Sequence, residues 1–403
     1  GYINRIDRTN GEVVNIRPRA GVDEPYERFN WDSPILVSHH DPKRIYFASQ
    51  RVWRSENRGD NWKAISKDLT KNQERLALPI MGKVQSFENA WDVYAMSTYN
   101  TITSLAESKT DENILYVGTD DGIIQLTKDG GKSWEKMTVD QLPKVPSTAF
   151  ANDIKADLYD KQTAYIALDN HKFGDYQPYL YKTIDGGKKW TSISNGIPDG
   201  TLVWRIVQDH IDPNLLFLGT EYGVYVSLNK GEKWHKFSSG LPTIPVRDLA
   251  IQKRENDLVL ATFGRSFYVL DDYSPLREIN EESIGKEAIL FAPKKALQYN
   301  RINGGTRSSG GATFNAKNPP YGAIFTYYLK EGHTSKRAKR QKAEMSEKAD
   351  RSLLEKLNKA GYKTTNKILE EEIDVLAKKT KIELKKLKKL VKILEDQKTK
   401  DIP

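Results

Sequence analysis

Short apolar runs rich in β-branched and aromatic residues, separated by polar turns, cover residues 1–290. Paired runs occur at 44–48 with 51–54, at 114–118 with 122–126, at 164–168 with 179–182, and at 215–219 with 223–227. Each pair is followed by a run that begins at a tryptophan and is preceded by another apolar run, as at 202–207. Runs of this length and composition predict β-strands joined by tight turns. The pattern therefore indicates four strands per repeat.

One motif marks the turn between the third and fourth strands of each repeat. Its pattern is Ser/Thr-x-Asp/Asn-x-Gly-x-x-Trp, and its successive tryptophans are 72, 56 and 44 residues apart. The four copies comprise Ser55, Asn57, Gly59 and Trp62; Thr127, Asp129, Gly131 and Trp134; Thr183, Asp185, Gly187 and Trp190; and Ser227, Asn229, Gly231 and Trp234. We expect the hydroxyl and the Asp/Asn side chain to hydrogen-bond within the turn and the glycine to be left-handed. We expect the tryptophan to fill the gap toward the next repeat. A repeated carboxylate also fits a catalytic or calcium site, but these tasks favour a structural role.

Four antiparallel strands repeated at this period are typical of a β-propeller, whose blades bury their faces by stacking on one another. A fifth repeat at 257–271 keeps its strands but lacks the motif. Residues 2–6 and 13–16 resemble the outer strands of an earlier, incomplete repeat. We therefore predict an all-β fold of about five and a half blades over residues 1–290.

The composition changes after this region. The sequence of residues 291–330 predicts a loop followed by a strand at 322–329. Residues 331–403 are rich in Lys, Glu and Leu, and apolar residues three and four apart predict helices at 335–359 and 366–398, broken at Gly361. The sequence thus predicts a charged helical hairpin after the propeller.

The charge follows the same division. The chain of 403 residues has 63 Lys and Arg against 54 Asp and Glu, a net charge of +9. Residues 330–403 hold 22 of the basic and 13 of the acidic residues, so the propeller region is neutral. The lysines at 385–389 could bind an acidic partner, a membrane surface or nucleic acid. No aromatic or base-reading pattern accompanies them, so we favour a solvated helix face and expect no nucleic-acid partner.

Cysteine is absent from the whole sequence. Its absence excludes disulfides, Cys-ligated zinc and thiol nucleophiles. The six histidines show no metal-ligand spacing. No apolar run reaches the roughly 18 residues that a membrane-spanning helix needs, so we expect no such segment. We predict no metal and no cofactor.

The turn motif resembles that of the Asp-box (BNR) repeat superfamily, which includes sialidases, xyloglucan-cleaving glycoside hydrolases and sortilin-type propellers. Within it, the chain resembles the bacterial sortilin-like propeller proteins that are often labelled glycosyl hydrolases. The resemblance also rests on residues 29–35, 39–42, 101–108, 118–122, 219–223 and 263–272. It implies a ten-bladed propeller of which this chain would be the C-terminal part, and a β-sandwich beginning within 291–330. The trafficking role of animal sortilins does not carry over, because their cysteine-rich module has no counterpart here.

Candidate site residues lie in turns and in two insertions. Asp120, Asp121 and Glu221 occupy turns between second and third strands, where they could be acid/base residues or ligand contacts. Glycosidases need two carboxylates about 5–9 Å apart, but Asp-Gly is also a favoured hairpin turn, and we favour the turn role. Arg205, Arg247 and Arg265 could bind a carboxylate, yet their spacing identifies no triad. The insertions at 68–98 and 170–178 can carry recognition residues. The predicted ligand-binding set is Trp91, Asp120, Asp121, Asn170, His171, Glu221, Tyr222 and Arg265, with no catalytic residue.

These features favour a non-catalytic recognition scaffold, secreted, periplasmic or at the cell surface, that binds a protein or glycan. Its partners could include the remaining half of the propeller or another envelope subunit. A glycoside hydrolase is the main alternative, and activity on sialosides or β-glucans that is lost in Asp121→Ala and Glu221→Ala would establish it. A structural subunit of an envelope assembly is the third.

Overall fold

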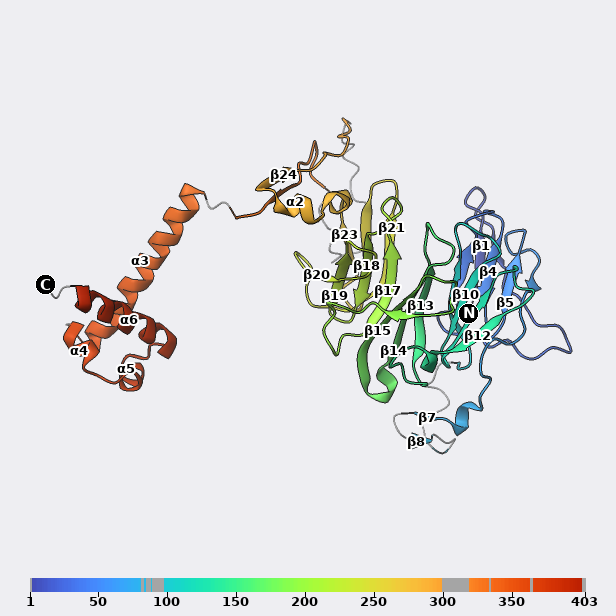
Figure 1. The fold of residues 1–403 in the computed structure, drawn as a ribbon, viewed down its shortest axis with the longest axis horizontal. Helices are drawn as coiled ribbons and strands as arrows, with labels where there is room; N and C mark the ends of the chain where they lie inside the picture. The colour runs from blue at the N-terminus through green and yellow to red at the C-terminus, as the bar shows by residue number, and fades with distance from the viewer. Residues whose placement is uncertain are drawn as a thin grey trace. The chain divides into compact units, whose positions relative to one another are not determined.

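The body of the chain consists of β-propeller blades, as the sequence predicts (Figure 1). The computed structural model describes residues 2–80, 83–84, 88, 98–298, 319–332, 335–362 and 365–400. Within these residues, four sheets have four antiparallel strands each and a fifth has three. A separate two-stranded sheet, β1 (Asn4–Ile6) with β2 (Val13–Asn15), precedes them. This agrees with the expected five and a half blades.

The strands follow one another in sequence order within each blade. Blade one is β3 (Ile35–Val37), β4 (Ile45–Ala48), β5 (Val52–Ser55) and β6 (Lys63–Ala64). Blade two is β9 (Ile102–Glu107), β10 (Leu115–Thr119), β11 (Ile123–Thr127) and β12 (Glu135–Thr138). Blade three is β13 (Phe150–Ala156), β14 (Ala164–Asn170), β15 (Asp175–Thr183) and β16 (Thr191–Ser192). Blade four is β17 (Val203–Gln208), β18 (Leu216–Thr220), β19 (Gly223–Ser227) and β20 (His235–Phe237), and blade five is β21 (Val246–Gln252), β22 (Asp257–Thr262) and β23 (Phe267–Leu270).

The first strand of each blade packs against the first strand of its neighbour. Two glycines in second strands let the first strand of the next blade come close. A Cβ on Gly118 would lie 2.5 Å from the Cβ of Ala151 in blade three, and a Cβ on Gly219 would lie 2.6 Å from the carbonyl oxygen of Val246 in blade five. Glycine in a strand commonly marks such a close approach. Gly118 in β10 and Gly219 in β18 therefore serve inter-blade packing.

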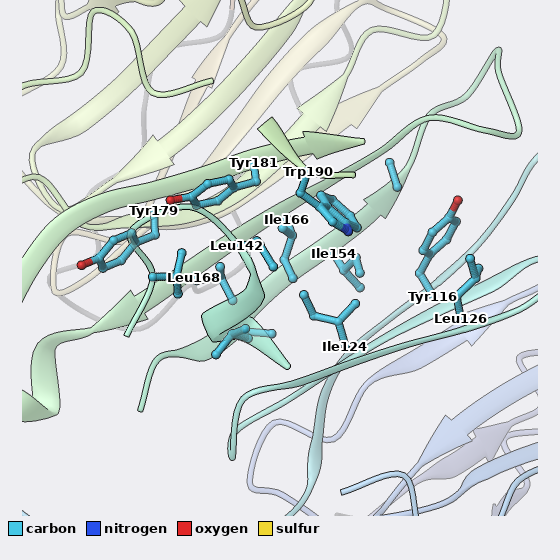
Figure 2. Packing of buried hydrophobic residues seen from close by; sticks show 14 of the residues in the cluster. Tyr116, Ile124, Leu126, Leu142, Ile154, Ile166, Leu168, Tyr179, Tyr181 and Trp190 are labelled. Carbon is cyan, nitrogen blue, oxygen red and sulfur yellow. The ribbon is translucent and has the colours of Figure 1, made fainter. Parts of the chain in front are cut away.

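The core lies between the blades, and its largest cluster joins blades two and three (Figure 2). Ile124 of blade two packs with Ile154 and Ile166 of blade three, and the last two are fully buried. β10, β14 and β18 are buried along their whole length, which explains why they read as continuous apolar runs rather than alternating ones. Burial of apolar area on both faces of each blade is the main stabilising contribution.

The turn motif has the same hydrogen bonds in all four copies. In blade two, the Thr127 hydroxyl accepts from the Gly131 N–H at 2.9 Å and donates to Asp129 Oδ1 at 2.8 Å. Asp129 Oδ1 also accepts from the Ser133 N–H at 2.9 Å. Hydrogen bonds from Ser133 and Thr127 lower the pKa of Asp129 well below its usual range. Gly131 has a φ of 96°, a left-handed conformation that glycine alone adopts freely. The Thr127 and Asp129 side chains therefore use their hydrogen-bonding groups to hold the turn.

The motif tryptophans pack on the preceding blade, so the expected packing toward the next blade is wrong. Trp134 Nε1 donates to the carbonyl of Ile65 in blade one at 3.2 Å. Trp234 Nε1 donates to Ile193 in blade three at 2.7 Å. Trp62 makes the same bond to Ile16, directly after β2, at 2.6 Å. This bond identifies β2 as the outer strand of a blade that precedes blade one. The turn glycine lies against the preceding blade as well, since a Cβ on Gly131 would lie 2.7 Å from the carbonyl oxygen of Ile65.

The chain forms two compact units, Gly1–Gly285 with Ile289–Tyr328, and Lys286–Ala288 with Leu329–Pro403. Short elements supplement the blades of the first unit. They are η1 (Arg75–Ala77), β7 (Pro79–Ile80), β8 (Lys83–Val84), η2 (Val139–Gln141), η3 (His171–Phe173), η4 (Ser274–Glu278) and α2 (Glu281–Gly285). The strand expected at 322–329 is shorter than predicted, since β25 (Tyr327–Leu329) alone is extended and pairs with β24 (Ala288–Leu290) upstream. A longer β-sandwich at 291–330 stays a prediction.

Helices form most of the second unit, but not as the two-helix hairpin expected. α3 (Lys336–Lys359) agrees with the prediction, whereas the helix expected at 366–398 is divided into α4 (Thr365–Leu369), α5 (Ile373–Thr380) and α6 (Leu384–Lys400). Lys381 takes a left-handed conformation at the end of α5 and ends that helix. The breaks let Leu357, Leu376 and Leu387 meet in one buried core. No described helix is long and apolar enough to cross a membrane.

Candidate functional site

The turns between second and third strands lie at the same end of the blades. In blade two, Thr119 at the end of β10 pairs with Ile102 at the start of β9, and blades three to five repeat this arrangement. A cavity of about 500 Å³ lies at this end, between blades two and three. Three of the predicted residues line it: Asp120, Asp121 and Asn170. A larger hollow of about 880 Å³ surrounds Trp134, but it lies over exposed outer strands and the turn motif. We therefore take the smaller cavity as the candidate site.

Asp120 is held by the start of blade two. Its Oδ1 accepts from the Thr101 N–H at 2.8 Å, and its Oδ2 accepts from the Thr101 hydroxyl at 2.6 Å. Asn30 Nδ2 lies 3.4 Å from the same Oδ2. Burial outweighs these hydrogen bonds and raises the pKa of Asp120 to about 7. Asp120 is therefore partly protonated near neutral pH.

Asp121 anchors the segment that enters the first insertion. Its Oδ1 accepts from the Thr119 hydroxyl at 2.5 Å, and its Oδ2 accepts from the Lys71 N–H at 2.6 Å. Burial raises the pKa of this carboxyl as well. Both carboxylates thus tie this turn to other segments, Asp120 to Thr101 before β9 and Asp121 to Lys71 in the first insertion.

The end of β14 forms the blade-three wall of the cavity. Asn170 Oδ1 accepts from the Thr148 hydroxyl at 2.8 Å, and its Nδ2 lies 3.2 Å from Asp175 Oδ2. Asp169 is completely buried. Its Oδ1 lies 2.5 Å from Nδ1 of His171, while its Oδ2 is buried without a hydrogen-bond partner in the described structure. This unpaired oxygen is costly to bury.

His171 and Glu221 belong to a second cluster, centred on Trp204. The His171 ring meets the Trp204 ring edge-on, with centroids 6.0 Å apart. Trp204 Nε1 donates to Glu221 Oε2 at 3.0 Å, and the Arg247 guanidinium lies 3.6 Å from the centroid of the indole. Arg247 also lies 3.8 Å from Glu221. Glu221 is not among the residues that line the cavity, so the three candidate carboxylates do not share it.

Tyr222 and Arg265 do not line this cavity. Tyr222 is exposed beside Glu221, and Arg265 is exposed in the turn before β23. Trp91 lies outside the described residues. None of the described residues forms a group of three or more His, Asp or Glu that could hold a metal ion.

Arg75 and Asp169 were missed by the sequence analysis. Arg75 lies in η1 within the first insertion and lines the cavity. Its Nε and Nη2 are buried and have no hydrogen-bond partner among the described residues. A basic residue in a polar insertion and an acidic residue at a strand end look ordinary in sequence. Only their burial in the folded chain distinguishes them.

No family model and no curated protein matches this sequence. Solved structures that match it include a GH74 enzyme from Niastella koreensis, at 13% identity over 62% of this chain and 36% of that one, with a TM-score of 0.45. A GH74 xyloglucanase from Xanthomonas campestris matches at 13% identity over 59% and 34%, with a TM-score of 0.40. The extracellular domain of a proposed one-component system from B. thetaiotaomicron matches at 15% identity over 66% and 31%, with a TM-score of 0.41. This chain spans about a third of the length of each. The propeller assignment rests on the strand pairing described above.

Proposed function

We propose that this chain is a non-catalytic recognition module of the cell envelope or secreted space, which binds a protein or glycan ligand in the cavity between blades two and three. The observation that carries this proposal is the combination of a cavity with buried polar groups that lack partners, on Arg75 and Asp169. Buried polar groups in folded proteins almost always have partners, and exceptions often mark functional sites. A rigid propeller that holds such groups in place suits binding.

The carboxylates support binding rather than hydrolysis. A retaining or inverting glycosidase needs one carboxylate free to attack or to activate water, opposite a proton donor. Asp120 and Asp121 instead accept hydrogen bonds from Thr101 and Lys71, and Glu221 accepts one from Trp204 outside this cavity. None of the three carboxylates predicted from the sequence is therefore free to attack a substrate in this cavity.

A glycoside hydrolase is the second candidate, and one property favours it. The pKa of Asp120, raised to about 7 by burial, would suit a general acid. Asp120 is only 8% exposed, however, and Thr101 holds both of its oxygens. Reaching a substrate would require Asp120 to give up these contacts.

Product analysis separates the two candidates. The intact chain is incubated overnight with a xyloglucan oligosaccharide and with digalacturonate, and the sugars are examined by mass spectrometry. We expect both to be recovered at full length. Shorter products that disappear in Asp120→Asn would establish hydrolysis and contradict the proposal. Arg254→Gln, which changes an exposed side chain of blade five, is the control for the preparation.

A further inference from the structure

One edge of the Arg75 guanidinium group has no hydrogen-bond partner in the described part of the chain. Its buried and unpaired atoms are Nε and Nη2, which lie on the same side of the planar group. Two parallel N–H bonds from this edge match the two oxygens of a carboxylate. Both atoms are buried from bulk solvent.

Arg277 shows in the same chain how this edge is used. Its Nε donates to Asp209 Oδ2 and its Nη2 donates to Asp209 Oδ1, both at 2.8 Å. Arg75 has the same two donors but, among the described residues, no corresponding carboxylate. The unpaired edge of Arg75 is therefore suited to a carboxylate.

Asp169 adds a second requirement, which is a hydrogen-bond donor on the ligand. Its buried Oδ2 has no donor among the residues that the structure describes, although Asp169 lines the same cavity as Arg75. A ligand that satisfied both groups would carry a carboxylate and a hydroxyl or another hydrogen-bond donor. Since both groups are covered in the free structure, side chains at the cavity must move when the ligand enters.

The charge of the cavity favours a single negative charge on the ligand. Lys71 and Lys172 join Arg75 on its lining, but Asp120, Asp121 and Asp169 oppose them. A dianionic phosphate would be repelled by Asp121, Asp169 and the ionised fraction of Asp120 more strongly than a carboxylate would be. The carboxylate is therefore the anion that best fits this set of charges.

Aromatic rings make up part of the apolar wall. Phe150, Phe173 and Tyr99 line the cavity, and the Lys172 ammonium lies 5.5 Å from the centroid of Phe150. Aromatic and apolar walls with a few placed polar groups are typical of small-molecule sites. A sugar ring combines an apolar face with hydroxyl donors at its edge, so it can meet both the rings and Asp169.

We propose that the cavity binds a uronic acid residue of an acidic glycan, with the sugar carboxylate on Nε and Nη2 of Arg75 and a sugar hydroxyl on Oδ2 of Asp169. This inference rests on the proposed recognition function and specifies its ligand. A peptide carboxylate would satisfy Arg75 as well, but it presents no hydroxylated ring to Asp169 and the aromatic wall.

Calorimetric titration of the intact chain tests the inference with three probes. They are digalacturonate, its carboxyl-reduced neutral analogue, and a short peptide with a free C-terminus. We expect digalacturonate to bind about tenfold or more tightly than the reduced sugar, because charge-assisted bonds to Arg75 are lost in the latter. Arg75→Gln should abolish this preference and leave the affinity for the reduced sugar unchanged. Asp169→Asn should weaken both sugars, and Arg254→Gln should change neither.

Each contrary result is informative. Equal binding of both sugars, or an unchanged preference in Arg75→Gln, overturns the uronic acid assignment while leaving the recognition function intact. Binding of the peptide but not of digalacturonate would contradict the uronic acid assignment and identify a peptide as the ligand of this site. Stability coupling between Arg75→Gln and Asp169→Asn in a ligand-free double-mutant cycle would show that the two residues pair with each other, which also contradicts the inference.

Discussion

Arg277 binds the buried carboxylate of Asp209 through both Nε and Nη2, and so connects the segment after blade five to blade four. The Tyr273 hydroxyl donates to the same carboxylate at 2.6 Å. Burial alone would raise the pKa of Asp209, but the hydrogen bonds from Arg277 and Tyr273 outweigh it and lower the pKa to about 2. The ionised pair is thus part of the structure that holds blade five in place.

Arg277→Gln should lower the free energy of unfolding of the propeller by about 2 to 3 kcal/mol, because it leaves a buried charge with fewer partners. Because the folded pKa of Asp209 lies below its unfolded value, this contribution is present above pH 4 and is lost as pH falls through about 2. Urea denaturation followed by tryptophan fluorescence measures the loss, since all eight tryptophans precede residue 330. An effect no larger than that of the exposed Arg254→Gln would contradict this role.

Trp190 and Trp234 occupy the same position of the motif but differ in their hydrogen bonding. Trp234 Nε1 donates to the Ile193 carbonyl, whereas Trp190 Nε1 is buried without a partner in the described structure. Trp234→Phe should therefore cost about 1 to 3 kcal/mol more than Trp190→Phe, because only the former strands a buried carbonyl. Urea midpoints of the two variants check the difference. Equal midpoints would show that the indole hydrogen bond contributes nothing beyond packing.

Asp120 should make the stability depend on pH in a specific direction. Its folded pKa of about 7 lies above its unfolded value near 4, so the folded chain keeps a proton that the unfolded chain releases between these values. The stabilisation that comes from the proton on Asp120 is complete below pH 4 and is lost as pH rises through about 7. Asp120→Asn cannot ionise and lacks this dependence. The difference in free energy of unfolding, wild type minus variant, should fall from pH 4 to pH 7 and then level off. A constant difference across this range would refute the raised pKa.

The repeats made much of the fold predictable. The tryptophan spacing and the paired apolar runs specify the blades, because each strand is short and each turn carries its own Gly, Asp or Asn. The direction of packing of Trp134 and Trp234 was not predictable, since both neighbouring blades offer apolar surface. The break at Lys381 was also missed, because the apolar spacing continues across it and only tertiary packing in the helical core decides the conformation there.

The candidate site was predictable only in part. Asp120, Asp121 and Asn170 follow strand ends in adjacent blades, so their positions in turns could be read from the sequence. Their meeting in one cavity depends on how blades two and three stack. Arg75 and Asp169 gave no sequence signal, because the missing partner of a buried group is a property of the folded structure.

A pocket-blocking substitution tests the central claim that this cavity is the recognition site. Ser147 is exposed and lines the cavity, so Ser147→Trp should obstruct it without disturbing the core. Ser192→Trp, on the exposed outer strand β16, is the matched control. The measurement is calorimetric titration of the intact chain and both variants with digalacturonate and its reduced analogue. The account predicts that binding persists in Ser192→Trp and is lost in Ser147→Trp. Unchanged binding in Ser147→Trp would contradict it.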